Sequence, residues 1–87
     1  MLTTFDAMLK SHLPTYAIVE LLIRLAAHNS VIGDYKDHAI TEDEVIVKTS
    51  GGTIKFPVRL IEMQFETPEL ITDEELVRAA SRFSPMN

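Results

Sequence analysis

The chain has 87 residues, of which 46% are hydrophobic and 24% charged, and its formal net charge is −5. These values are typical of one folded domain spanning residues 1–87 and exclude the disordered and fibrous classes. The acidic balance argues against general affinity for nucleic acid, because neutralising phosphates requires an excess of lysine and arginine.

A first helix is predicted close to the amino terminus, where Thr3 or Thr4 can act as the N-cap. Pro14 ends this helix, because the residue before a proline is disfavoured in helical conformation. Four apolar residues recur at spacings that place them on one helical face: Phe5, Met8, Leu9 and Leu13.

A second helix is predicted from a Thr15 cap to about His28, and its central part, Tyr16–Ala27, is apolar on nearly every side. Glu20 and Arg24 form a narrow polar seam with His28, and we expect Glu20 and Arg24 to make an exposed ion pair. A helix that is hydrophobic all round must be covered by other protein. We therefore expect an interface formed by Tyr16, Ile18, Val19, Leu22, Ile23, Leu25 and Ala26.

Two strands are predicted at Glu44–Thr49 and Ile54–Ile61, because both segments are rich in β-branched residues. A two-residue turn at Gly51–Gly52 would join them into a hairpin. This turn implies three cross-strand pairs that share one face: Thr49 with Ile54, Val47 with Phe56, and Val45 with Val58. Signals in the preceding segment, Val31–Ala39, conflict: Gly33–Asp34 indicates a turn, while Tyr35 and Ile40 fit either a first strand or a loop.

Pro57 lacks a backbone N–H, which predicts that its strand lies at a sheet edge, or at least that its nitrogen points away from a partner strand. The spacing of apolar residues changes after Leu60, and a bulge or strand end there would explain the change. On the face opposite the core, Glu44 is expected to pair with Arg59, and Lys48 is expected opposite Lys55.

The last helix is predicted to begin at Thr72, which forms a capping-box pattern with Glu75, and to end at Ser84–Pro85. Its expected buried face consists of Leu76, Val77, Ala79, Ala80 and Phe83. The sequence as a whole predicts an α+β fold with two N-terminal helices, an antiparallel hairpin or three-stranded meander, and a C-terminal helix.

The chain contains no cysteine, which excludes a disulfide framework and a thiolate metal site and favours the cytoplasm. Met1–Lys10 lacks the pattern of a signal peptide, and Tyr16–Ala27 is shorter than the ~20 residues that cross a bilayer. We therefore expect no contact with a membrane.

No sequence motif indicates a catalytic nucleophile or a phosphate-binding loop, so we expect neither an enzyme nor a cofactor. His28, Asp34, Asp37 and His38 could ligate a metal, but their spacing fits a solvated polar loop better. An enzyme built at a dimer interface would need a pocket containing His28, His38 or Glu20.

Two charged groups are candidates for binding a partner. Lys48, Lys55 and Arg59 would form a basic patch that either contacts a phosphate backbone or acidic partner, or only keeps the hairpin soluble. Glu69, Asp73 and Glu74 lie around the start of the last helix, where the helix dipole stabilises negative charge. They could also bind a basic protein.

The function we expect is that of a small acidic interaction or regulatory protein that acts by association and forms a homodimer. The alternative is a regulator resembling winged-helix proteins in using the Gly51–Gly52 hairpin as a wing on nucleic acid. Salt dependence discriminates between them, because phosphate binding weakens steeply as salt rises.

Overall fold

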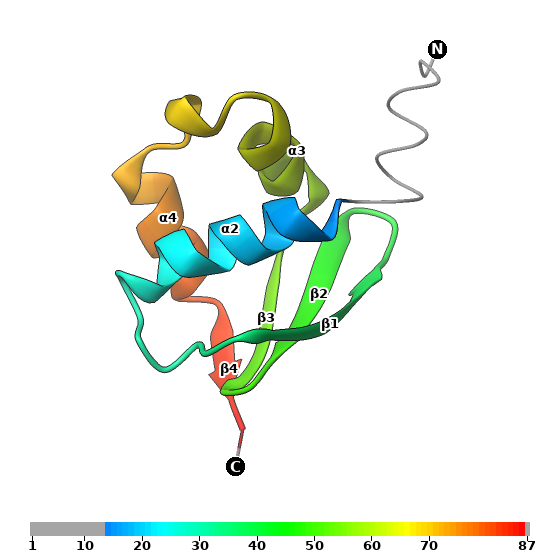
Figure 1. Cartoon of the computed structure of the whole chain (residues 1–87), viewed down its shortest axis with the longest axis vertical. Coiled ribbons are helices and arrows are strands. Elements are labelled where there is room, and N and C mark those ends of the chain that lie inside the picture. The colour runs from blue at the N-terminus through cyan, green and yellow to red at the C-terminus, as the bar shows by residue number, and fades with distance from the viewer. Residues whose placement is uncertain (1–13, 87) are drawn as a thin grey trace.

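The computed structural model describes residues 14–86, in which three α-helices pack against one face of a four-stranded antiparallel sheet (Figure 1). The strand order in the sheet is β1-β2-β3-β4. The elements in chain order are α2 (Thr15–Ala26), β1 (Tyr35–Ile40), β2 (Glu44–Thr49), β3 (Gly52–Pro57), α3 (Val58–Glu66), the 3-10 helix η1 (Pro68–Leu70), α4 (Asp73–Ala80) and β4 (Phe83–Pro85). The α+β class is confirmed. The helix expected before Pro14 lies outside the described residues.

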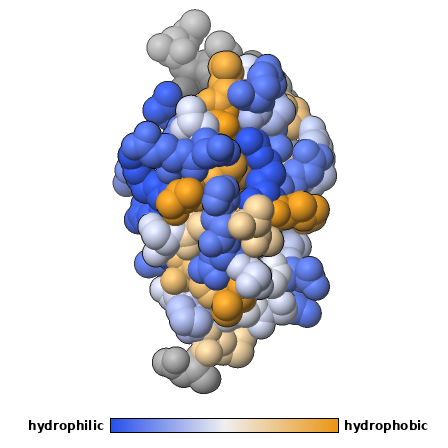
Figure 2. All heavy atoms as spheres, turned by 90° about the vertical axis from the view of Figure 1, so that its left-hand side faces the viewer, coloured by the Kyte–Doolittle hydropathy of each residue, from blue (hydrophilic) through white to orange (hydrophobic). Residues whose placement is uncertain are grey.

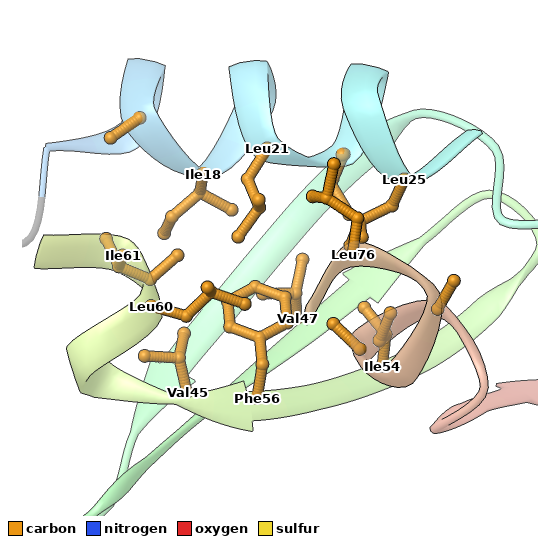
Figure 3. Packing of buried hydrophobic residues seen from close by; sticks show 14 of the residues in the cluster. Ile18, Leu21, Leu25, Val45, Val47, Ile54, Phe56, Leu60, Ile61 and Leu76 are labelled. Carbon is orange, nitrogen blue, oxygen red and sulfur yellow. The ribbon is translucent and has the colours of Figure 1, made fainter. Parts of the chain in front are cut away.

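The core lies between α2 and the sheet. Alternation along β2 and β3 buries Val45, Val47, Ile54 and Phe56 on one face of the sheet, as period-two patterning predicts. The Phe56 ring lies at the centre of the cluster, below Ile18 and Leu21 of α2 and between side chains of α3 and α4 (Figure 3). The opposite face of these two strands carries the exposed Lys48 and Lys55.

The hairpin turn lies one residue earlier than expected, because Thr49 pairs with Gly52 and leaves Ser50 and Gly51 as the turn residues. The register therefore differs by two residues: Val47 pairs with Ile54, and Val45 with Phe56. A shift of two keeps every side chain on its expected face. Buried Thr49 holds the turn in place, since its Oγ1 accepts from the N–H of Gly52 at 3.1 Å and donates to the carbonyl of Ile32.

Gly52 of β3 lies directly against the backbone of β4. Its φ is +155°, and a Cβ built on it would lie 2.1 Å from the carbonyl oxygen of Ser84. Gly52 pairs with Pro85 in the sheet, and Met86 N–H donates to the carbonyl of Gly51 at 2.8 Å. Both the backbone conformation and the contact therefore require glycine at this position.

The strand expected over Ile54–Ile61 is confirmed only as far as Pro57, because the segment that follows is a helix. The strand therefore ends before Leu60 and has no bulge there, and the expected edge position is wrong, because β3 lies between β2 and β4. Pro57 is the N-cap of α3, with φ −66° and ψ 145°, a position where its missing N–H costs nothing. Leu60, Ile61 and Gln64 are buried at helical spacing, which explains the change in apolar pattern. Arg59 therefore lies on α3 and not in the hairpin. The expected pairs Glu44–Arg59 and Lys48–Lys55 are also wrong. Glu44 pairs with Pro57, and Lys48 pairs with Thr53.

The start of the last helix is confirmed: Thr72 Oγ1 accepts from Glu75 N–H at 3.1 Å, and Glu75 returns a bond to Thr72 N–H. Its end at Ser84–Pro85 is wrong, because α4 ends at Ala80. Phe83 instead begins β4 and pairs with Ile54. Val77 was expected to be buried, but its side chain points to solvent and is 51% exposed.

Residues 35–40 form the edge strand β1, so the segment preceding the hairpin contains a strand and no helix. The hairpin itself lies in the middle of the sheet, between β1 and β4, and does not project as a wing. Within residues 14–86, no helix has the length and apolar character needed to cross a membrane.

Candidate association surface

The apolar residues of α2 divide into a buried group and a surface group. Ile18 and Leu25 are fully buried in the chain's own core, and Leu22 is 3% exposed. The surface group consists of Tyr16, Val19, Ile23 and Ala26. Within it Ile23 is 68% exposed and Tyr16 55%. These four residues follow at helical spacings of three and four, so they form one stripe along α2. We call it the α2 stripe.

A groove runs beside this stripe, between α2 and the start of β1, and has a volume of about 540 Å³. In Figure 1, α2 and β1 both lie toward the viewer, with the helix above the strand. Three stripe residues line the groove together with Leu22 and four residues of the following loop and strand: Val19, Ile23, Ala26, Ser30, Gly33, Asp34 and Tyr35. An apolar wall of this kind, next to a few polar groups, is typical of a binding surface.

Strand β1 forms one edge of the sheet and borders the groove through Tyr35. It has six residues, whereas β4 at the opposite edge has three and ends in a proline. The Tyr35 hydroxyl lies 2.8 Å from His38 Nδ1, and the His38 N–H donates to Asp37 Oδ1 at 2.8 Å. Of the two edge strands within residues 14–86, β1 is therefore the longer. The side chains of Tyr35, Asp37 and His38 on it are held by these hydrogen bonds.

The polar seam of α2 contacts a neighbouring helix through Arg24 and Glu20, although Glu20 and His28 are exposed. Arg24 Nη1 donates to Gln64 Oε1 of α3 at 2.7 Å, and Gln64 Nε2 donates to Glu20 Oε2 at 3.4 Å. Gln64 thus stands between the two charged residues, and no direct Glu20–Arg24 ion pair occurs within the described part of the chain. The expected direct ion pair is wrong, because Arg24 and Glu20 each hydrogen-bond to Gln64 of α3.

Tyr16 also contacts α3, where its ring lies 5.9 Å from the ring of Phe65, centroid to centroid, at 54°. This tilted arrangement is favourable for two aromatic rings. Tyr16 therefore links the α2 stripe to α3 at one end. The freely presented part of the stripe is centred on Ile23.

The two charged groups proposed from sequence lie on different parts of the molecule. Lys48 and Lys55 remain on the open face of the sheet, while Arg59 is exposed on α3. The three therefore do not form one patch on a hairpin. Glu69 lies in η1, and Asp73 and Glu74 lie in the first turn of α4.

Glu74 makes an exposed ion pair with Arg78 at 3.3 Å, and the two residues are four apart on the helix.

Figure 2 shows the side of the molecule that carries α4 and the end of α2, where apolar side chains lie in separate patches among hydrophilic ones.

The candidate metal residues do not converge: no group of three histidine, aspartate or glutamate side chains within residues 14–86 is placed to hold one ion. His38 is engaged with Tyr35, and Asp34 lines the groove. A second hollow of about 400 Å³ lies over the sheet near Gly52, and its charged lining residues are Lys36 and Lys48. Neither hollow contains a histidine among its lining residues.

Sequence reasoning found the α2 side of this surface and missed the opposite wall. Gly33–Asp34 was interpreted as a turn, and the structure adds that Gly33 has φ +81° and that Asp34 N–H donates to Ser50 Oγ at 2.8 Å. This bond holds residues 33–35 beside α2. No local pattern in the sequence indicates a contact between residues so far apart.

Comparison with protein-family models gives no match, and comparisons with curated proteins and with solved structures give no significant match. The function proposed below therefore depends on the surface alone.

Proposed function

We propose that this protein acts by association, and that a second copy of the chain covers the surface formed by α2 and β1. The observation that carries the proposal is the exposure of Ile23, which is 68% accessible beside a groove walled by Val19 and Ala26. Large apolar side chains that gather beside a groove and next to a sheet edge mark interaction sites.

A second copy is the simplest partner for this surface. In a two-fold dimer the same patch is used by both subunits, so an apolar stripe meets an identical apolar stripe. The domain is also small: at 87 residues its core is modest, and association adds buried apolar area without adding chain length. The α2 stripe itself contains no charged residue, so no like charges within it would meet across a two-fold contact.

The alternative of nucleic-acid binding has no specific structural observation in its favour. The hairpin lies within the sheet, and the lysines of its open face are not joined by Arg59. Binding of a basic protein to Glu69, Asp73 and Glu74 likewise has only their exposure as support.

The test is a charge introduced into the stripe, Ile23→Asp, compared with the same change at an exposed apolar residue elsewhere, Val77→Asp on α4. Sedimentation velocity over a range of protein concentrations measures the mass of each. We expect dimers for the wild type and Val77→Asp, and a monomer for Ile23→Asp with an unchanged circular dichroism spectrum. The dissociation constant of the wild-type dimer should change little between about 0.05 and about 0.5 M salt, because apolar burial dominates the contact and no phosphate is neutralised.

Two results would contradict the proposal. The first is a wild-type protein that remains monomeric at every concentration. The second is an Ile23→Asp variant that dimerises as tightly as the wild type.

A further inference from the structure

We propose that the open face of the sheet carries a binding site for a small phosphate monoester with an apolar body. The site is the hollow of about 400 Å³ near Gly52, which we call the sheet hollow. Its volume lies in the range of about 300–1,000 Å³ that is typical of small-molecule sites. The side chains that the argument uses are those of Lys36, Lys48, Thr53, Ser84, Pro85 and Met86.

Strand pairing places the polar residues of the sheet hollow side by side. Lys48 of β2 pairs with Thr53 of β3, and Thr53 pairs with Ser84 of β4. Directly paired residues of an antiparallel sheet share one face, with Cβ atoms about 4.5–5.5 Å apart. This row is therefore on the face that carries exposed Lys48, opposite the three described helices (Figure 1). Short residues form its middle, between the long side chains of Lys48 and Met86, which accounts for the hollow.

An irregularity in β1 adds a second lysine to the sheet hollow. The register between β1 and β2 shifts between Tyr35 and Asp37, so Lys36 is an extra residue without a partner of its own in β2. A bulge of this kind changes the direction of a side chain. Asp37 pairs with Lys48 but does not line the hollow, and its carboxylate accepts from His38 N–H. The described lining thus includes two ammonium groups and no carboxylate.

The polar groups of the sheet hollow have no partners within residues 14–86. Both ion pairs in this part of the chain belong to arginines, and the hydroxyl groups of Thr53 and Ser84 make no hydrogen bond there. Lysine on an edge strand discourages pairing with another chain, which accounts for Lys36 on β1. It does not account for Lys48, because β2 lies inside the sheet, between β1 and β3.

The charge of the sheet hollow favours a phosphate monoester as its ligand. Such a group carries close to two negative charges at neutral pH, because its second proton dissociates below that pH. Two lysines match this charge, and their ammonium groups and the two hydroxyl groups can donate hydrogen bonds to its terminal oxygens. A longer polyanion such as nucleic acid is disfavoured, because the chain has a net charge of −5.

The apolar part of the ligand is inferred from the opposite side of the sheet hollow. Pro85 and Met86, both exposed, line it at the end of β4. Methionine is flexible and polarizable, so it adapts to apolar groups of different shapes. Inorganic phosphate would leave this side of the hollow unused.

The first test compares Lys48→Ser with its matched control Lys55→Ser. Both lysines are exposed on the open face of the sheet, and each variant loses one positive charge, but Lys55 does not line the hollow. Isothermal titration calorimetry with 1-naphthyl phosphate measures the dissociation constant. We expect Lys48→Ser to bind about tenfold more weakly than the wild type, which corresponds to one hydrogen bond to a charged group, and Lys55→Ser to match the wild type. Circular dichroism checks that both variants are folded.

The second test separates the anionic and apolar parts of the ligand. Inorganic phosphate lacks the apolar body, and 1-naphthoate carries only one negative charge, so both should bind more weakly than 1-naphthyl phosphate. Met86→Ser should weaken binding of 1-naphthyl phosphate and leave binding of inorganic phosphate unchanged. Amide NMR shifts on titration should be largest in residues 48–53 and 84–86 and small in α2.

Four results would overturn the site. The first is a wild-type protein that does not bind 1-naphthyl phosphate at millimolar concentration. The second is equal weakening by Lys48→Ser and Lys55→Ser, which would show only a general attraction to surface charge. The third is binding of 1-naphthoate as tight as that of the phosphate ester. The fourth is tighter binding of a mixed-sequence oligonucleotide, which would assign the lysines to nucleic acid. None of these results depends on whether the chain dimerises, because the α2 stripe does not line the sheet hollow.

Discussion

Arg24 and Gln64 form the hydrogen bond that joins α2 to α3, with Arg24 Nη1 donating to Gln64 Oε1 at 2.7 Å. The same guanidinium also donates to the carbonyl of Pro68 at 3.1 Å. One partly buried side chain therefore connects the long helix to α3 and to η1. Its contacts orient α2 so that the Ile23 side of the helix faces outward.

Replacing Arg24 should loosen this junction. We expect Arg24→Ala to lower the free energy of unfolding by about 2 kcal/mol, because it removes hydrogen bonds to a charged group and leaves Gln64 partly unpaired. Urea unfolding at one fixed protein concentration measures the loss. Arg78→Ala is the control, since its exposed pair with Glu74 should contribute less than about 0.5 kcal/mol. Equal losses in the two variants would refute this role of Arg24.

Leu22 and Ile23 are adjacent residues with opposite roles. Leu22 is 3% exposed and Ile23 is 68% exposed. We expect Leu22→Ala to cost about 2–5 kcal/mol through loss of apolar contact and formation of a cavity, and Leu22→Asp to prevent folding. Ile23→Ala should leave the unfolding of the monomer nearly unchanged. Thermal melts of dilute protein check this, and a Leu22→Ala variant as stable as the wild type would show that the position is not in the core.

Gly52 should tolerate no side chain. We expect Gly52→Val to destabilise the protein by at least about 2 kcal/mol, because the new side chain meets the backbone of β4 and the residue has positive φ. Amide hydrogen exchange should show the largest loss of protection in Phe83–Pro85 and in its partner strand. Ser84→Ala, which changes an exposed side chain on β4, serves as the control. Unchanged melting of Gly52→Val would disprove the close approach.

Thr72 caps α4 through its hydroxyl group. We expect Thr72→Ala to cost about 1 kcal/mol, which for a domain of this size lowers the melting temperature by about 4–8 °C. Thr72→Ser keeps the hydroxyl and should stay close to the wild type. If both variants melt alike, the capping bond to Glu75 does not contribute to stability.

Elements with strong local signals could be predicted from the sequence. The capping box of α4 involves residues three apart, and β2 shows a clear two-residue alternation, so neither depends on distant contacts. The face of the hairpin was predicted correctly despite the wrong register, because a shift of two residues conserves the pattern of burial.

The errors arose where tertiary contacts outweigh local preference. Val58 and Ile61 favour strands by propensity, yet both lie in α3, whose buried side chains pack on α2. Gln64 was overlooked because its partners, Glu20 and Arg24, lie 44 and 40 residues earlier in the chain. At the candidate site the stripe on α2 was predictable, whereas the wall at residues 33–35 depends on the distant contact with Ser50.

The position of β4 has a consequence for how the fold is reached during synthesis. The strand pairs with β3, but two helices and η1 lie between them in the chain. While a ribosome is still making α4, the outer side of β3 has no partner and exposes unpaired backbone groups. The nascent sheet therefore has an additional open edge until Phe83–Pro85 emerges, and such an unpaired edge exposes a partly made chain to aggregation.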